Sequence, residues 1–115
     1  MELYTYRAKV LSVYDGDTIR VEIDLGFGMK WVGDGRGVQI RLSGIDAPEI
    51  KGSSRNLGLL SRDWLRQKIN GREVILKTIK DSTEKYGRYL GIIYLEDENI
   101  NESLVVNGFA EKKEY

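Results

Sequence analysis

The sequence predicts a mainly β protein with helices: a five-stranded barrel with one helix inserted after the third strand and a short helix near the C-terminus. Three observations lead to this prediction. Apolar and polar residues alternate in several short stretches, which is typical of strands with one buried face. Glycine-containing turns separate these stretches. One central stretch instead spaces its apolar residues three and four apart, which is typical of an amphipathic helix.

The first strand is predicted over residues 3–13. Alternation places Tyr4 and Val10 on the same face, and the pattern then shifts to Leu11 and Val13. A shift of this kind inside a strand predicts a β-bulge.

The second strand is predicted over residues 18–25, after a turn at Asp15-Gly16. Asp17 has the parity of the inward residues, so we expect its carboxylate to point toward the inner face at the start of this strand. Strict alternation predicts four inward apolar residues: Ile19, Val21, Ile23 and Leu25.

Residues 26–37 hold five glycines, and we expect a mobile loop there. Trp31 and Val32 are its apolar residues, and we expect them either to anchor the loop or to contact a substrate. The third strand follows over residues 38–42.

The inserted helix is expected to begin at Ser53 or Ser54, because either side chain can serve as an N-cap. The helix is expected to end at Asn70-Gly71. The predicted apolar stripe of this helix consists of Leu57, Leu60, Trp64, Leu65 and Ile69.

Two further strands are predicted over residues 74–79 and 89–95, and residues 97–99 are expected to form a turn. Asn101 is expected to cap the short last helix and Gly108 to end it. The order is therefore β-β-β-α-β-β-α, which matches the OB-fold, a five-stranded, partly open barrel.

The composition excludes several classes of enzyme. The chain has 115 residues, and we expect a single domain over residues 1–115. It contains no His and no Cys, which rules out Ser-His-Asp and Cys-His enzymes and zinc–thiolate sites. Carboxylates and arginines are the groups left for chemistry near neutral pH. A metal held only by oxygen would be a hard cation such as calcium or magnesium.

The net charge of +0 does not indicate a strongly basic nucleic-acid-binding protein. Between Lys51 and Arg88, however, ten cations and four anions give a local charge of +6. Such a segment is common on a solvated surface and also attracts phosphates. No apolar stretch approaches the length of a membrane span, and the first residues do not begin a signal peptide. We therefore expect a cytoplasmic protein, or a chain from which a leader has been removed.

Carboxylates stand at turns beside two predicted strands. Asp17 leaves a turn into the second strand, and Asp46 and Glu49 lie just beyond the third. If these strands are neighbours, the carboxylates converge at one end of the barrel, near Arg41 and Arg88. A cation opposed by two guanidiniums suits phosphoryl transfer, because both stabilise charge on phosphate oxygens. Each motif alone is most often a turn, a cap or a surface charge, and it is their combination that points to a site.

Four motifs occur in this order along the chain: Asp15-Gly16-Asp17-Thr18, Arg41-Leu42 followed by Asp46-Ala47-Pro48-Glu49, Lys85-Tyr86-Gly87-Arg88, and Asn101-Glu102-Ser103-Leu104-Val105 with Gly108. Through these motifs the chain resembles the staphylococcal nuclease (thermonuclease) family from about Val10 to about Ala110. The resemblance implies a calcium-dependent phosphodiesterase that acts on DNA and RNA and leaves 3′-phosphate and 5′-hydroxyl ends, and we expect single-stranded DNA and RNA as the substrates.

The resemblance also implies roles for the carboxylates. Asp17 and Asp46 would be the side-chain calcium ligands, and the backbone carbonyl of Ala47 would be a third ligand. Asp15 would hold a neighbouring water without touching the metal. Glu49 would activate or orient the attacking water.

The same resemblance assigns the remaining groups to the substrate. Arg41 and Arg88 would stabilise the five-coordinate phosphorus. Lys85 and Tyr86 would contact a neighbouring phosphate, and Leu90 would lie against the nucleotide base.

Two alternatives remain open at this stage. A catalytically silent OB-fold module that binds nucleic acid or protein is the first, and a barrel that serves only in assembly is the second. Silent relatives are expected to lose metal ligands, the glutamate or the arginines, and this sequence keeps all of them.

Two features depart from the family pattern. The aromatic residue that packs on the base in the family falls here at Glu114, with Tyr115 one step later. The family's third helix has no counterpart in this sequence. We expect apolar surface that this helix would cover to favour a homodimer. The candidate contact residues are Tyr4, Tyr6, Val106 and Phe109.

Overall fold

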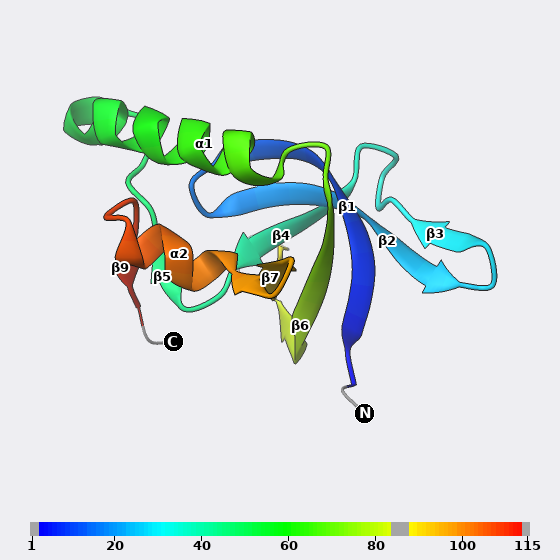
Figure 1. Ribbon diagram of the computed structural model, residues 1–115. Coiled ribbons are helices and arrows are strands. Elements are labelled where there is room, and N and C mark those ends of the chain that lie inside the picture. The colour runs from blue at the N-terminus through cyan, green and yellow to red at the C-terminus, as the bar shows by residue number, and fades with distance from the viewer. Residues whose placement is uncertain (1–2, 84–87, 114–115) are drawn as a thin grey trace.

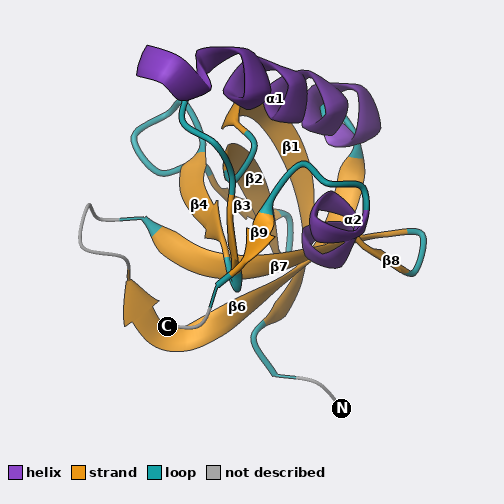
Figure 2. Cartoon of the chain, turned by 90° about the vertical axis from the view of Figure 1, so that its left-hand side faces the viewer, coloured by secondary structure: helices purple, strands orange, loops and turns teal. Residues whose placement is uncertain are grey.

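Five strands close into a barrel, because the first strand pairs with both the second and the sixth. The computed structural model describes residues 3–83 and 88–113 (Figures 1 and 2). All pairings in the barrel are antiparallel except that of β4 with β7. This closed arrangement with a helix inserted before β6 confirms the predicted OB-fold. The barrel strands are β1 (Thr5–Asp15), β2 (Thr18–Gly26), β4 (Val38–Leu42), β6 (Glu73–Thr83) and β7 (Tyr89–Leu95).

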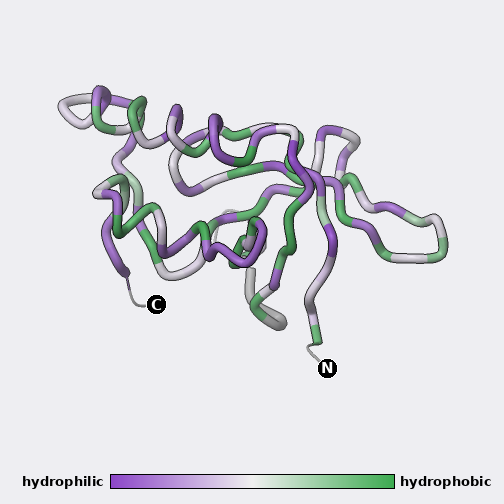
Figure 3. Tube along the Cα trace, viewed as in Figure 1, coloured by the Kyte–Doolittle hydropathy of each residue, from purple (hydrophilic) through white to green (hydrophobic). Residues whose placement is uncertain are grey.

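The interior of the barrel is filled by most of the residues that alternation placed inward, but Leu11 is exposed. Ile19, Val21 and Ile23 are buried, as are Val10 and Val13 of β1. The predicted bulge is confirmed, because the register of β1 against β2 shifts between Val10 and Ser12. In Figure 3, short hydrophobic and hydrophilic stretches alternate along the chain.

The predicted loop over residues 26–37 contains a short edge strand, β3 (Met29–Trp31), which pairs with the end of β2. The two strands form an arm that projects from the barrel, at the right of Figure 1. Leu25 is exposed, contrary to the prediction, because β2 has left the barrel at that point and no opposite wall covers it. Trp31 contacts Tyr89 edge to face, with ring centroids 5.7 Å apart, and so anchors the arm. The mobility of the loop stays a prediction.

A short 3-10 turn, η1 (Gly52–Ser54), leads into the inserted helix α1 (Arg55–Ile69). Ser54 stands at the N-cap, but its hydroxyl donates to the carbonyls of Glu49 and Lys51 and does not cap the helix. The hydroxyl thereby fastens the preceding loop to the start of α1.

The buried face of α1 differs from the predicted stripe. Leu57 and Leu60 are 60% and 58% exposed, whereas Leu65 and Ile69 are buried as expected. Close approach of the helix explains the difference: a Cβ on Gly58 would lie 2.5 Å from the Glu49 carbonyl oxygen. A small residue, which the spacing of apolar residues does not reveal, makes that contact.

The last helix, α2 (Ile100–Val106), follows a two-residue strand, β8 (Glu98–Asn99), that lies within the predicted turn. Its N-cap is Asn99, whose side chain accepts from the Glu102 N–H, so the predicted cap at Asn101 is wrong. Gly108 ends the helix region with a φ of 80°, as expected. A small second sheet joins β5 (Ile45–Asp46) to β9 (Glu111–Lys112) near the C-terminus (Figure 2).

Asn101 is instead a buried link between α2 and the barrel. Its side-chain oxygen accepts from the Ile93 N–H at 3.2 Å. Its nitrogen donates to the carbonyl of Ser43 at 2.9 Å and to that of Gly91 at 3.1 Å. The side chain therefore joins α2 to β7 and to the segment that follows β4.

The surface expected to mediate a homodimer is only partly exposed. Tyr6 and Phe109 pack against the core, and Phe109 also stacks on Trp64. Tyr4 and Val106 are exposed. The homodimer stays a prediction. Within the described ranges, no helix is long and apolar enough to cross a membrane.

Asn101→Ala is predicted to lower the free energy of unfolding by about 2–3 kcal/mol, because it leaves the Ile93 N–H buried without its acceptor. Urea denaturation measures this change. Asn107→Ala is the matched control, since that exposed amide makes one bond to Ser103, and a change within about 0.5 kcal/mol is expected. Equal losses in the two variants would contradict the buried role of Asn101.

Candidate active site

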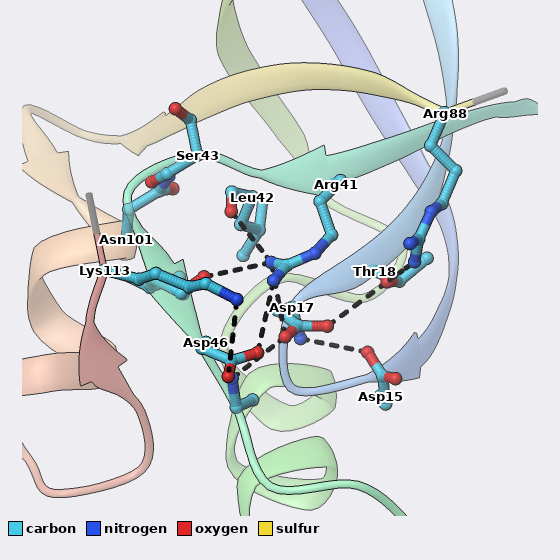
Figure 4. A network of polar contacts seen from close by, with 12 residues as sticks. Asp15, Asp17, Thr18, Arg41, Leu42, Ser43, Asp46, Arg88, Asn101 and Lys113 are labelled. Carbon is cyan, nitrogen blue, oxygen red and sulfur yellow. Dashed lines mark hydrogen bonds and ion pairs between the residues drawn. The ribbon is translucent and has the colours of Figure 1, made fainter. Parts of the chain in front are cut away.

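The candidate site lies where β2 begins and β4 ends, as the sequence predicted. Thr18 pairs with Arg41 in the β2–β4 register, and the Leu42 N–H donates to the Asp17 carbonyl at 2.8 Å. These backbone contacts bring the Asp17 and Arg41 side chains together at one end of the barrel (Figure 4). β2 and β4 are therefore neighbours, which is the condition under which the carboxylates were expected to converge.

Asp17 and Arg41 form a buried ion pair, with 3.2 Å between Oδ2 and Nη1. Both residues are less than a tenth exposed, at 6% and 7%. Asp17 Oδ2 also accepts from the Ala47 N–H at 2.9 Å, and Oδ1 accepts from the Thr18 hydroxyl at 3.2 Å. A buried carboxylate is stable only when it is paired and hydrogen-bonded, and Asp17 meets both conditions.

Arg41 joins the two predicted metal ligands. Its Nη2 donates to Asp46 Oδ1 at 3.3 Å, while Nη1 donates to the carbonyls of Leu42 and Ile45, each at 3.1 Å. The Asp46 side chain is half exposed. The guanidinium thus holds one buried carboxylate and one that faces solvent.

Arg88 reaches the same network through Thr18. Its Nη1 donates to the Thr18 hydroxyl at 3.0 Å, and that hydroxyl donates in turn to Asp17. Figure 4 shows Arg41 approaching this network from β4 and Arg88 from the residue that precedes β7. The Thr18 side chain links the second arginine to the carboxylates, a role that the sequence alone did not predict.

Asp15 lies beside Asp17 and accepts from its backbone N–H at 3.0 Å. Burial raises the pKa of Asp15 to about 7, and the neighbouring Asp17 carboxylate adds to the rise. The protonation of Asp15 therefore changes near neutral pH.

Glu49 is not part of this network. Its side chain is 72% exposed, and its Oε2 lies 3.8 Å from Lys51 Nζ. Leu90 is half-buried and pairs with Arg41 in the β4–β7 register. Lys85 and Tyr86 lie outside the described residues. The structure thus brings together six predicted residues and leaves Glu49 in solvent. The six are Asp15, Asp17, Arg41, Asp46, Ala47 and Arg88.

The position of Gly16 depends on packing that the sequence pattern did not reveal. A Cβ there would lie 2.7 Å from Ser61 Cβ and 2.8 Å from Ala47 Cβ. Only glycine lets the turn pass between α1 and the segment after β5. The Ser61 hydroxyl, also buried, donates to the Phe109 carbonyl at 2.6 Å.

The donor set suits a hard cation. All candidate ligands offer oxygen, and the Asp46 carboxylate is accessible to solvent. Asp17 Oδ1 accepts one hydrogen bond from the protein and keeps capacity for a further partner. Within residues 3–83 and 88–113, no three carboxylates gather as a ready-made metal cluster. A cation here would therefore take two carboxylates, with backbone carbonyls or water as the other ligands.

Several nuclease-named proteins are similar to this chain over about nine tenths of its length. The family model described as staphylococcal nuclease homologue matches residues 39–115. A thermonuclease of Staphylococcus hyicus is 32% identical over 110 residues, which cover 93% of this chain and 59% of the relative. An uncharacterized endonuclease of Escherichia coli is 34% identical over 89% of this chain and 58% of the relative. Endonuclease Htp3 of Saprolegnia parasitica is 29% identical over 92% and 55%.

The chain therefore belongs to the staphylococcal nuclease family, as the motifs predicted. It spans less than two thirds of the length of these relatives.

Arg41→Gln is predicted to lower the free energy of unfolding by about 3 kcal/mol or more, because it leaves the Asp17 carboxylate buried without its ion pair. Asp17→Asn combined with Arg41→Gln is expected to recover part of the loss, since no unpaired charge remains. Denaturant titration of the two single variants and the double variant measures the coupling.

Arg36→Gln is the control for this cycle. Arg36 pairs with Asp34 at 2.6 Å on the exposed surface, and such pairs contribute little. Additive losses in the cycle, with no coupling between the two positions, would rule out the ion pair as the organising contact.

Proposed function

We propose that this protein is a calcium-dependent nuclease that hydrolyses phosphodiester bonds of single-stranded DNA and RNA, leaving 3′-phosphate and 5′-hydroxyl ends. The observation that carries the proposal is the position of Arg41 between Asp17 and Asp46, with Arg88 linked to the same carboxylates through Thr18. Membership of the staphylococcal nuclease family and the names of the relatives support it.

Calcium would be held by the carboxylates of Asp17 and Asp46 and the backbone carbonyl of Ala47. When bound, it would offset negative charge on the phosphate and favour deprotonation of water. The Ala47 N–H fixes the Asp17 carboxylate, so this ligand needs little rearrangement. Asp15 would orient a water beside the site.

The two arginines would bind the phosphate that is attacked. Four acceptors already fix the orientation of the Arg41 guanidinium, so little conformational entropy is lost when it meets a substrate oxygen. Arg88 is oriented by Thr18. Positive charge held in place where negative charge develops is a large contribution to phosphoryl transfer.

Glu49 would act as the general base. Its carboxylate is in solvent and its contact with Lys51 is long, so it is accessible to water. Catalytic hydrogen bonds are often loose in a free enzyme and tighten with substrate. Lys85 and Tyr86 would contact the adjacent phosphate, and Leu90, beside Arg41 in the register, would contact a base.

A catalytically silent module that binds nucleic acid is the alternative. The discriminating observation is hydrolysis itself, since a silent module would bind oligonucleotides with or without calcium and cleave neither DNA nor RNA.

With excess calcium the protein is predicted to cleave a labelled single-stranded oligonucleotide. With chelator, no cleavage is expected. Magnesium is expected to support little turnover, because its stricter octahedral geometry presents water and phosphate differently. Asp46→Asn should raise the calcium concentration needed for half-maximal cleavage. Asp97→Asn, at an exposed turn, should leave it unchanged. Equal cleavage with calcium and with chelator would exclude the metal-dependent reaction, and binding without cleavage would favour the silent module.

Glu49→Gln and Arg88→Gln are each predicted to lower turnover by roughly 10²–10⁴-fold, the usual contribution of general acid–base catalysis. For Arg88 the reason is charge that grows only in the transition state. Initial rates at saturating calcium measure the effect, with circular dichroism as a check on folding. Arg72→Gln and Glu96→Gln, which alter an exposed ion pair, are the controls. A wild-type rate in either test variant would remove that residue from the mechanism.

A further inference from the structure

A groove runs between α1 and the outer surface of β1 and β2, next to the candidate active site. Its volume is about 600 Å³. Among the residues that the structure describes, four arginines line it, together with Tyr14 and Thr18, and none of these lining residues carries a carboxylate. We call this feature the arginine groove. Its arginines are Arg20, Arg55, Arg62 and Arg66.

The arginine groove is a concave surface of one charge sign. Arg62 pairs with Asp63 at 3.0 Å, and Arg20 lies 3.8 Å from Asp34, but both carboxylates stand outside the lining and are at least half exposed. Within the described part of the chain, the Arg55 side chain has no hydrogen-bond or ion-pair partner. A cleft lined by one sign of charge raises the local concentration of ions of the opposite sign. The ligand that suits it is therefore an anion.

The arrangement of the arginines suits a linear polyanion. Arg55, Arg62 and Arg66 lie seven and four residues apart, which places them in a row along one face of α1. Arg55 and Arg62 are separated by about 10 Å along the helix axis at 1.5 Å per residue. Arg20 lines the groove from the opposite side, on β2. Guanidinium groups spaced in this way match the repeated phosphates of a nucleic acid strand better than one small anion.

The groove is continuous with the candidate active site. Thr18 lines the groove, and its hydroxyl accepts from Arg88 at 3.0 Å. The next outward residue of β2 is Arg20, which pairs with Gln39 just as Thr18 pairs with Arg41. A strand whose phosphate meets Arg41 and Arg88 therefore finds the groove directly beside it.

Tyr14 supplies an aromatic surface in the same groove. This residue is 71% exposed, on β1 just before Asp15, the last residue of that strand. An exposed aromatic ring beside guanidinium groups is the combination that proteins use to bind single-stranded nucleic acids, because every base can stack on a ring while the backbone meets cations.

We propose that the arginine groove binds the backbone of a single-stranded nucleic acid outside the phosphate that is cleaved, with a base stacked on Tyr14. The proposal rests on the proposed function, since it extends the substrate site of that nuclease. The protein would then bind strands that are several nucleotides long. Specificity for the base is not expected, because the groove offers mainly charge and one ring.

The test measures binding of 12-nucleotide DNA and RNA strands by fluorescence anisotropy, with chelator present so that hydrolysis does not intervene. The double variant Arg55→Gln/Arg62→Gln is expected to weaken binding roughly tenfold. The slope of log Kd against log salt concentration is expected to fall by about 1.4. Tyr14→Ala is expected to weaken binding about fivefold or more without changing the salt dependence. Arg20 and Arg66 are left intact because each also bonds to a backbone carbonyl.

Arg7→Gln with Lys9→Gln is the matched control. These two exposed cations stand on β1 outside the groove, and the double substitution removes the same charge. Its affinity is expected to stay within about twofold of the wild type. Equal loss in the control and in the arginine double variant would overturn the proposal, because it would show only an effect of net charge.

A sulfated polysaccharide of similar length separates nucleic acid from polyanions in general. The Tyr14→Ala variant should bind the polysaccharide as the wild type does and bind DNA more weakly. No effect of Tyr14→Ala on DNA or RNA would overturn the assignment to nucleic acid.

Cleavage kinetics separate this proposal from the proposed function. In the arginine double variant, the ratio of kcat/KM on a 12-nucleotide strand to that on a dinucleotide is expected to fall about tenfold. A wild type that binds through the groove but cleaves nothing would refute the nuclease and keep the groove. A wild type that cleaves, with groove variants that match the control, would refute the groove and keep the nuclease.

Discussion

The structure around the candidate site depends on one interaction, the buried ion pair between Asp17 and Arg41. A charge removed from water is costly unless partners replace the lost hydration. Arg41 finds those partners in Asp17, Asp46 and two backbone carbonyls. The same contacts fix the start of β2, the end of β4 and the segment that joins β4 to β5. Arg41 therefore organises the backbone as well as the charge of the site.

Close packing of small residues keeps this network in place. Gly16 passes between Ser61 of α1 and Ala47, and Gly58 lets the helix approach the segment that carries Glu49. The Ala47 N–H then points at Asp17. Rigid elements thus position the buried charges, which favours a site that needs little reorganisation when substrate binds. Asp46 and Glu49 instead face solvent.

The cationic surface extends from this network along α1. The local positive charge of the central segment is consistent with a solvated helix face when it is taken from composition alone. In three dimensions, three of these arginines lie opposite Tyr14 and Arg20 and beside Thr18. Near-zero net charge therefore conceals a strongly polarised surface. The proposed site and the arginine groove form one continuous region because Thr18 belongs to both.

By itself, the sequence determined the alternation of the barrel strands, the bulge in β1 and the grouping of carboxylates and arginines at turns, because these follow from local side-chain periodicity and turn chemistry. The absence of His and Cys also limits the chemistry that this chain can perform in any fold. Only the tertiary structure decided which partner covers each surface. Leu57 and Leu60 are exposed because glycine and serine make the close contact between α1 and the barrel. Asn101 binds the barrel instead of capping its helix, and Thr18 connects Arg88 to Asp17. These contacts join residues far apart in the chain, so they are fixed by packing geometry that local periodicity does not encode.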